Sequence, residues 1–206
     1  MIYYAVRAIC WLILKIFWKI EVIGIENLPK EGGLILAANH VSYLDPIVLA
    51  ITMKRKICFI TKKEAFNNIF GSVLLKNLNA FPVDREKVDI RSLKKSLSIL
   101  EEKKVLGIFP EGTRSKNGKL QELKLGIIKI GMKTGIPILP IGISGVNNSI
   151  YSQGKLFPNL FKKYKINVRY GSLLYLDKGK IGDKTYQKEA LNALGQKIKE
   201  LTHSHK

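Results

Sequence analysis

Short apolar runs alternate with amphipathic segments along this chain, and the alternation limits its fold more than any other feature. Continuous apolar runs are typical of strands buried on both faces, whereas apolar residues at helical spacing indicate helices. The predicted strands cover residues 34–38, 57–60, 80–83, 105–109, 138–143 and 166–170, and the predicted helices cover residues 1–19, 47–53, 64–78, 89–103, 125–133 and 184–201. An α/β fold is therefore predicted, with a mixed, partly parallel sheet flanked by helices.

The first 19 residues form an apolar, aromatic segment that three cations interrupt. It lacks the charge order and cleavage site of a signal peptide, and its longest uninterrupted apolar run, residues 8–14, is too short to span a bilayer. A helix here would carry cations on one side and an apolar stripe on another. The cations are Arg7, Lys15 and Lys19, and the apolar stripe consists of Trp11, Leu14 and Trp18. The pattern predicts a membrane-associating surface helix at residues 1–19, followed by a single domain at 20–206; a core-packing first helix is the alternative.

The charge balance narrows the possible partners. The 206 residues include 35 Lys and Arg but 16 Asp and Glu, a formal net charge of +19. Such a charge suits an anionic membrane surface, a phosphorylated substrate or nucleic acid. Nucleic acid is disfavoured because the aromatic residues cluster at the N-terminus and at residues 151–175 instead of alternating with lysines. The two cysteines exclude a disulfide scaffold.

Histidine is scarce, and this limits the chemistry. Of three histidines, only His40 lies outside the last five residues. A catalytic zinc site with two or three histidine ligands is therefore not expected, and neither a metal nor another cofactor is predicted.

The segment NHVSYLDP (39–46) lies where a predicted strand ends and a helix begins. Ligands of open α/β folds bind at this edge of the sheet. His40 and Asp45 are close enough across a tight turn for the carboxylate to bind one ring nitrogen and leave the other as a general base. Two structural alternatives remain: Asp45 as a helix N-cap, and His40 as a satisfied core histidine.

Two further strand ends carry cations. The segment FPEGTRS (109–115) offers backbone amides, the Thr113 hydroxyl and the planar Arg114 guanidinium to a phosphate, unless it is only a turn with a solvated cationic face. The segment NAFPVDR (79–85) closes on Arg85, which by itself is more simply a surface charge.

Together these segments resemble the glycerolipid acyltransferase family, most closely its bacterial members that acylate 1-acyl-glycerol-3-phosphate. Residues 39–45 match the NHxSxxD motif and residues 109–115 match FPEGTRS completely, while residues 81–85 and 136–141 are similar to two other motifs. The resemblance extends from about Ile20 to Gly171. Asn79 stands where the family commonly has glycine, and Leu123 where it commonly has an aromatic residue.

The resemblance implies a role for each matching residue. His40 would be the general base and Asp45 would orient it, so that the acceptor oxygen attacks the acyl thioester directly. The implied substrate-binding residues are Arg85, Arg114 and Lys124 for the acceptor phosphate, with Glu111, Gly112 and Thr113 shaping the adjoining pocket. The implied reaction moves a fatty acyl group from acyl-CoA or acyl carrier protein to the 2-hydroxyl of 1-acyl-glycerol-3-phosphate (lysophosphatidic acid), giving phosphatidic acid.

Other functions stay open at this point. The same chemistry could act on glycerol-3-phosphate or another lysolipid, or the chain could be a basic membrane-binding module without catalysis. Because one substrate lies in the membrane and the other in the cytosol, the expected location is the cytoplasmic face of the cell membrane, as a peripheral or monotopic protein.

Overall fold

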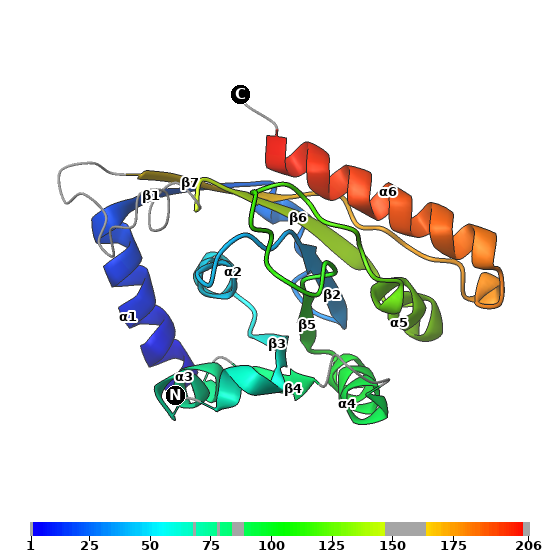
Figure 1. Cartoon of the computed structure of the whole chain (residues 1–206), viewed down its shortest axis with the longest axis horizontal. Helices are drawn as coiled ribbons and strands as arrows, with labels where there is room; N and C mark the ends of the chain where they lie inside the picture. The colour runs from blue at the N-terminus through cyan, green and yellow to red at the C-terminus, as the bar shows by residue number, and fades with distance from the viewer. Residues whose placement is uncertain (1, 68, 78, 84–88, 147–163, 204–206) are drawn as a thin grey trace.

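A computed structural model describes residues 2–67, 69–77, 79–83, 89–146 and 164–203 (Figure 1). The strands are β1 (Trp18–Ile23), β2 (Leu34–Ala38), β3 (Ile57–Lys62), β4 (Phe81–Val83), β5 (Val105–Ile108), β6 (Ile138–Ser144) and β7 (Tyr164–Tyr170). The α-helices are α1 (Ile2–Phe17), α2 (Asp45–Thr52), α3 (Ile69–Asn77), α4 (Ile90–Glu101), α5 (Gly126–Thr134) and α6 (Lys184–His203). Three short 3₁₀ helices are η1 (Ile25–Asn27), η2 (Lys63–Phe66) and η3 (Lys178–Lys180).

The seven strands form one mixed sheet in the order β1-β7-β6-β2-β5-β3-β4. Every neighbouring pair is parallel except β6 and β7, which are antiparallel. The α/β prediction with a partly parallel sheet is therefore confirmed. Strand β1 was not expected, because the pattern of residues 18 and 19 continued the preceding helix. Its pairing with β7, some 146 residues away at Trp18 and Tyr164, draws these residues into an edge strand.

Helices cover both faces of the sheet. In Figure 1, α1 and α2 lie on one side of the curved sheet, and α4, α5 and α6 lie on the other. The central strand β2 is buried throughout because its side chains alternate between these layers. Leu34, Leu36 and Ala38 pack with α2, whereas Ile35 and Ala37 pack with α4, α5 and α6. The strand therefore ends in the middle of the molecule, where it delivers the NHVSYLDP turn.

The first helix differs from the expected surface helix in which side chains it buries. Leu14 and Trp18 are only 3% and 6% exposed and belong to the core, whereas Trp11 is 46% exposed. The prediction that these three residues form one exposed apolar stripe is wrong, because Leu14 and Trp18 pack into the core against the sheet. A different set is exposed on α1: Ile9, Leu12, Ile13 and Ile16.

The predicted cationic side of the helix is altered as well. Arg7 turns inward and donates to the Ile51 carbonyl of α2 at 3.3 Å. Within the described part of the chain, no helix has both the length and the apolar character needed to cross a membrane.

Candidate active site

Asn39 anchors the end of β2 to the neighbouring strand β6. Its side chain is almost fully buried, and its amide donates to the Ile143 carbonyl at 2.9 Å while its carbonyl accepts from the Ile143 amide at 2.7 Å. These two side-chain hydrogen bonds take the place of backbone hydrogen bonds between β2 and β6 at the point where the chain leaves the sheet. The residue that follows, His40, is held in a defined place as a result.

His40 and Asp45 form the pair that their spacing suggested. His40 Nδ1 lies 2.8 Å from Asp45 Oδ2, and the side chains are 15% and 0% exposed. With a proton on Nδ1 donated to the carboxylate, the lone pair of Nε2 is left for another partner. Among the described residues, no hydrogen bond to Nε2 is found.

The Asp45 carboxylate also shapes the turn that carries His40. The same Oδ2 atom accepts from the backbone amides of Val41 and Ser42, both at 2.7 Å. These amides precede α2, and the cap position Leu44 has no side-chain cap hydrogen bond. The alternative of Asp45 as an N-cap is therefore wrong. His40 is not a core histidine either, because its ring is partly exposed.

Glu111 joins the two main motifs. Its Oε1 accepts from the His40 backbone amide at 2.7 Å, and its Oε2 accepts from the Gln121 amide at 2.8 Å. The Ser115 amide donates to the His40 carbonyl at 2.8 Å, so both sides of the His40 backbone are held by the 109–115 turn. Burial raises the pKa of Glu111, and the two backbone hydrogen bonds act in the opposite direction.

Gly112 and Lys124 lie in direct contact beside this carboxylate. The Gly112 backbone has a φ of 71°, and a Cβ placed there would lie 2.8 Å from Lys124 Cε. The Lys124 amide donates to the Pro110 carbonyl at 2.8 Å, which holds the lysine against the turn. The missing side chain at Gly112 therefore makes room for the Lys124 side chain.

Three further residues were predicted to bind the substrate: Arg114, Thr113 and Arg85. The Arg114 guanidinium carbon lies 3.4 Å from the ring centroid of Tyr43, in the loop between His40 and Asp45. Thr113 is exposed. Arg85 lies outside the described residues, so convergence of three cations on one anion stays a prediction.

Sequence reasoning missed two aromatic contacts of the site. The Phe109 ring stacks on the His40 ring, with centroids 4.1 Å apart and planes at 19°. Phe59 stacks on Phe109 in turn, with centroids 6.0 Å apart. Phe109 stands inside a recognised motif but carries no polar group that singled it out, and nothing in the sequence pattern pointed to Phe59.

Two departures from the family pattern are accommodated. Asn79 adopts a φ of 55°, a conformation that asparagine tolerates better than most residues. Leu123 packs against Gly195 of α6, where a Cβ would lie 3.4 Å from Leu123 Cδ1. Among the described residues, no group of three or more His, Cys, Asp or Glu is arranged to hold a metal ion.

Comparison with known proteins gives the family. The acyltransferase family model matches residues 19–144. The chain is 34% identical over 191 residues to the 1-acyl-sn-glycerol-3-phosphate acyltransferase of Bacillus subtilis, which covers 92% of this chain and 91% of that protein. A protein of the same description from Borreliella burgdorferi is 32% identical over 132 residues, covering 63% of this chain and 53% of that protein.

The fold has a solved counterpart. The crystal structure of the 1-acyl-sn-glycerophosphate acyltransferase from Thermotoga maritima superposes with a TM-score of 0.76, covering 99% of this chain and 81% of that one at 23% identity. The family match spans well over half of the sequence, and the Bacillus subtilis relative aligns along nearly all of it. This chain therefore belongs to the acyltransferase family.

Proposed function

We propose that this protein transfers a fatty acyl group from a thioester donor to the free 2-hydroxyl of 1-acyl-glycerol-3-phosphate, forming phosphatidic acid. The observation that carries the proposal is the 2.8 Å hydrogen bond between His40 Nδ1 and Asp45 Oδ2 at the end of β2. The nearly full-length similarity to the Bacillus subtilis protein supports the choice of acceptor.

The pair acts through the nitrogen that Asp45 leaves free. His40 Nε2 takes the proton of the acceptor hydroxyl as its oxygen attacks the thioester carbonyl carbon. The carbon–sulfur bond then breaks, and the departing thiolate recovers the proton from His40. Asp45 stabilises the transient imidazolium, and general-base catalysis of this kind contributes about 10²–10⁴-fold. No acyl-enzyme is required, because the nucleophile is the acceptor itself.

Cations beside the pair bind the acceptor phosphate. Arg114 supplies a planar fork and Lys124 a point charge, and Arg85 completes the set. Glu111 and Gly112 shape the pocket, since the Glu111 carboxylate is occupied by two backbone amides and Gly112 admits the Lys124 side chain. Thr113 adds an exposed hydroxyl to the same turn.

Residues 1–19 place the domain of residues 20–206 on the cytoplasmic leaflet as a peripheral or monotopic protein. Four isoleucine and leucine side chains on α1 are 49–59% exposed, and they recur at the i, i+3, i+4 and i+7 spacing of one helix face: Ile9, Leu12, Ile13 and Ile16. Such a face buries itself at the headgroup boundary, while anionic lipids attract the basic surface.

Vesicle flotation tests the membrane proposal. Replacing the four exposed residues with serine should reduce flotation with neutral vesicles, whereas Lys30→Ser, outside α1, should not. Truncation is a poorer test, because it removes Leu14 from the core. Equal flotation of the four-residue variant and the unaltered protein would refute this role for α1.

A purified-enzyme assay tests the catalytic proposal. Acyl-CoA and acyl carrier protein thioesters are offered with 1-acyl-glycerol-3-phosphate, glycerol-3-phosphate or another lysolipid. We expect phosphatidic acid from the first acceptor, a loss of about 10³-fold in His40→Ala, and normal turnover in the control His203→Ala, whose ring lies exposed on α6. Preference for another acceptor would show that the substrate is not 1-acyl-glycerol-3-phosphate. Lack of turnover with every combination of donor and acceptor would favour a non-catalytic membrane-binding module.

A further inference from the structure

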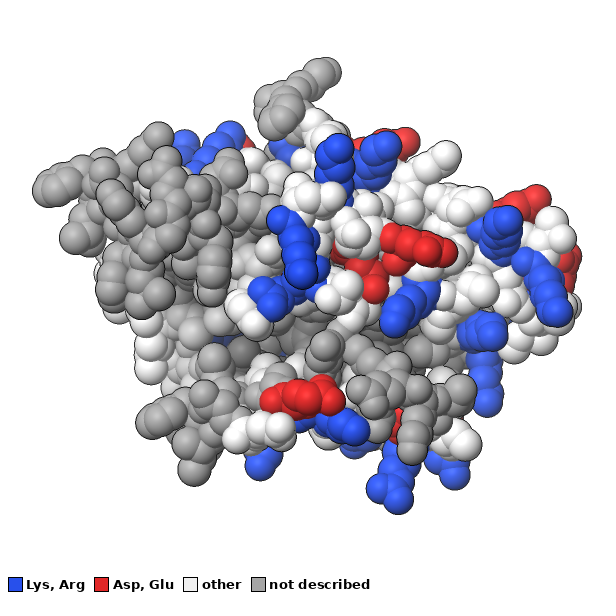
Figure 2. Space-filling view, viewed as in Figure 1, with Lys and Arg blue, Asp and Glu red and all other residues white. Residues whose placement is uncertain are grey.

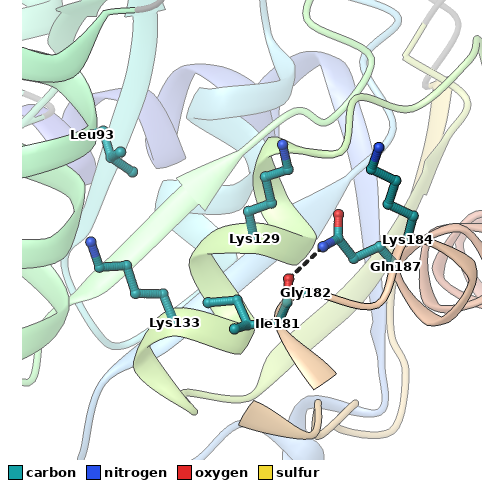
Figure 3. A pocket seen from close by; sticks show the side chains of 7 residues that line it. All are labelled: Leu93, Lys129, Lys133, Ile181, Gly182, Lys184 and Gln187. Atoms are coloured by element: carbon teal, nitrogen blue, oxygen red, sulfur yellow. Dashed lines mark hydrogen bonds between the residues drawn. The ribbon is translucent and has the colours of Figure 1, made fainter. Parts of the chain in front are cut away.

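A groove runs beside the candidate active site, between the loop of residues 120–125 and helices α5 and α6. Its larger part has a volume of about 1070 Å³ and its smaller part about 310 Å³, and the two parts share Lys129, Lys184 and Gln187. Gln187 donates to the Ile181 carbonyl at 2.7 Å (Figure 3). This bond fixes the turn before α6, so the floor of the groove is ordered by the fold.

Lysines dominate the described lining of the groove. One acidic residue, Glu122, accompanies five exposed lysines, and no ion pair is found for any of the five within the described chain. The five are Lys124, Lys129, Lys133, Lys184 and Lys188. Figure 2 shows Lys and Arg side chains, with acidic side chains among them, over this α5 and α6 end of the molecule. The groove therefore favours an anionic ligand.

The charges are spread in rows and do not converge on a point. Lys129 and Lys133 are one turn apart on α5, and Lys184 and Lys188 are one turn apart on α6. Figure 3 shows the side chains of Lys129, Lys133 and Lys184 with their terminal nitrogens apart from one another. Arginine is absent from the described lining. A nucleotide phosphate is bound by converging forks or amides, whereas separated lysines match carboxylates spread over a protein surface.

Exposed apolar side chains lie among the lysines. Leu93, Leu125 and Ile181 line the groove and are 37%, 39% and 47% exposed. An apolar contact area bordered by charged side chains is the usual composition of a protein interface. The lining thus suits a folded partner better than a small polyanion.

The wall of the groove is linked to His40 through Glu111, and α1 lies at the other end of the molecule (Figure 1). Glu111 accepts from the Gln121 amide of the groove wall and from the His40 amide of the catalytic turn, so one side chain connects the two. In Figure 1, α1 lies at the end of the molecule opposite α5 and α6. With α1 at a membrane, a ligand of this groove arrives from water.

We propose that the groove docks an acidic carrier protein that presents the acyl thioester to His40. This inference rests on the proposed acyl transfer and names the class of its donor. The lysine rows attract the acidic face of the carrier, and the 120–125 loop, which Glu111 links to the His40 turn, is the side of the groove from which its thioester reaches the catalytic pair. Docking of this kind weakens as salt rises.

Charge reversal in the groove tests the proposal. The variant Lys129→Glu/Lys184→Glu changes two lysines that lie outside the catalytic machinery, and Lys30→Glu/Lys54→Glu makes the same charge change at exposed sites elsewhere. Acyl carrier protein and coenzyme A thioesters of the same acyl chain are compared on detergent-dispersed acceptor. We expect kcat/KM for the carrier protein to fall at least about tenfold in the groove variant only, with the coenzyme A donor within about twofold.

Several results would overturn the proposal. An equal fall in kcat/KM with both donors would assign the lysines to phosphate binding. No fall with the carrier protein, or an equal fall in the control variant, would show that the groove does not dock the carrier. An unaltered protein that uses coenzyme A thioesters alone would also overturn the proposal. A second groove variant, Lys133→Glu/Lys188→Glu, replaces the first if circular dichroism shows that the first is unfolded.

A binding measurement separates this proposal from the proposed function. Calorimetric titration with carrier protein that bears a free thiol requires no turnover. If every donor fails in the assay, acyl transfer is refuted; docking is then judged by this titration, in which the groove variant must bind more weakly than the control. Undetectable binding to the unaltered protein overturns the docking proposal.

Discussion

Replacing Asp45 with alanine should destabilise this protein more than replacing His40, although the two side chains form one pair. The Asp45 carboxylate accepts from His40 Nδ1 and from the backbone amides of Val41 and Ser42. Alanine leaves both part-buried amides without their acceptor, and an unsatisfied donor costs about 1–3 kcal/mol when it is buried. With some relief from removing a buried charge, the free energy of unfolding should fall by about 2–4 kcal/mol.

His40→Ala leaves the two amide bonds of Asp45 in place. It removes one side-chain hydrogen bond and the 4.1 Å stacking on Phe109, so we expect a loss of about 1–2 kcal/mol. Urea unfolding of the two variants at one pH measures the difference. A loss for Asp45→Ala no larger than that for His40→Ala would refute this account of the turn.

Turnover should follow a different pattern from stability. Both single variants should lose activity, and the double variant should be no slower than the slower single variant, because residues that act as a unit are not additive. Asp45→Asn keeps an acceptor oxygen for the turn but removes the charge that stabilises the imidazolium. It should therefore be more stable than Asp45→Ala and still slow, and full turnover in this variant would show that the charge is dispensable.

Three further predictions concern the 109–115 turn. Arg114→Lys should raise the KM for 1-acyl-glycerol-3-phosphate at nearly constant kcat, because lysine keeps the charge but loses the planar fork that stacks 3.4 Å from the Tyr43 ring; an unchanged KM would remove Arg114 from the phosphate site. Gly112→Ala should cost about 1–2 kcal/mol in thermal unfolding and weaken acceptor binding, because φ is 71° and the new Cβ would meet the Lys124 side chain; normal stability and KM would contradict the contact. Burial raises the pKa of Glu111 above 4.5, so the folded state keeps this proton to a higher pH than the unfolded chain, and the stability of the protein relative to Glu111→Gln should fall as pH rises from about 4.5 to the raised pKa; a pH-independent difference in urea unfolding would contradict it.

Local patterns were sufficient for most of the elements, β1 excepted, and for the contact between His40 and Asp45. All six predicted strands agree with the structure within two residues at each end, and the predicted helix of residues 184–201 ends two residues early. His40 and Asp45 lie five residues apart on one turn, so their contact depends on local geometry that the sequence specifies. The motifs could be recognised from consecutive residues alone, without knowing which distant residues they contact.

Contacts between distant segments were decided only by the tertiary structure. Periodicity shows that one face of the first helix is apolar, but Leu14 enters the core because the sheet lies beside it, while Ile13 stays exposed. The backbone amide of His40 is a hydrogen-bond donor like that of any other residue. Only folding brings Glu111, 71 positions away, close enough to accept from it. Lys129 and Lys184 become neighbours in one groove for the same reason, since packing of α5 against α6 depends on side-chain complementarity that no local pattern records.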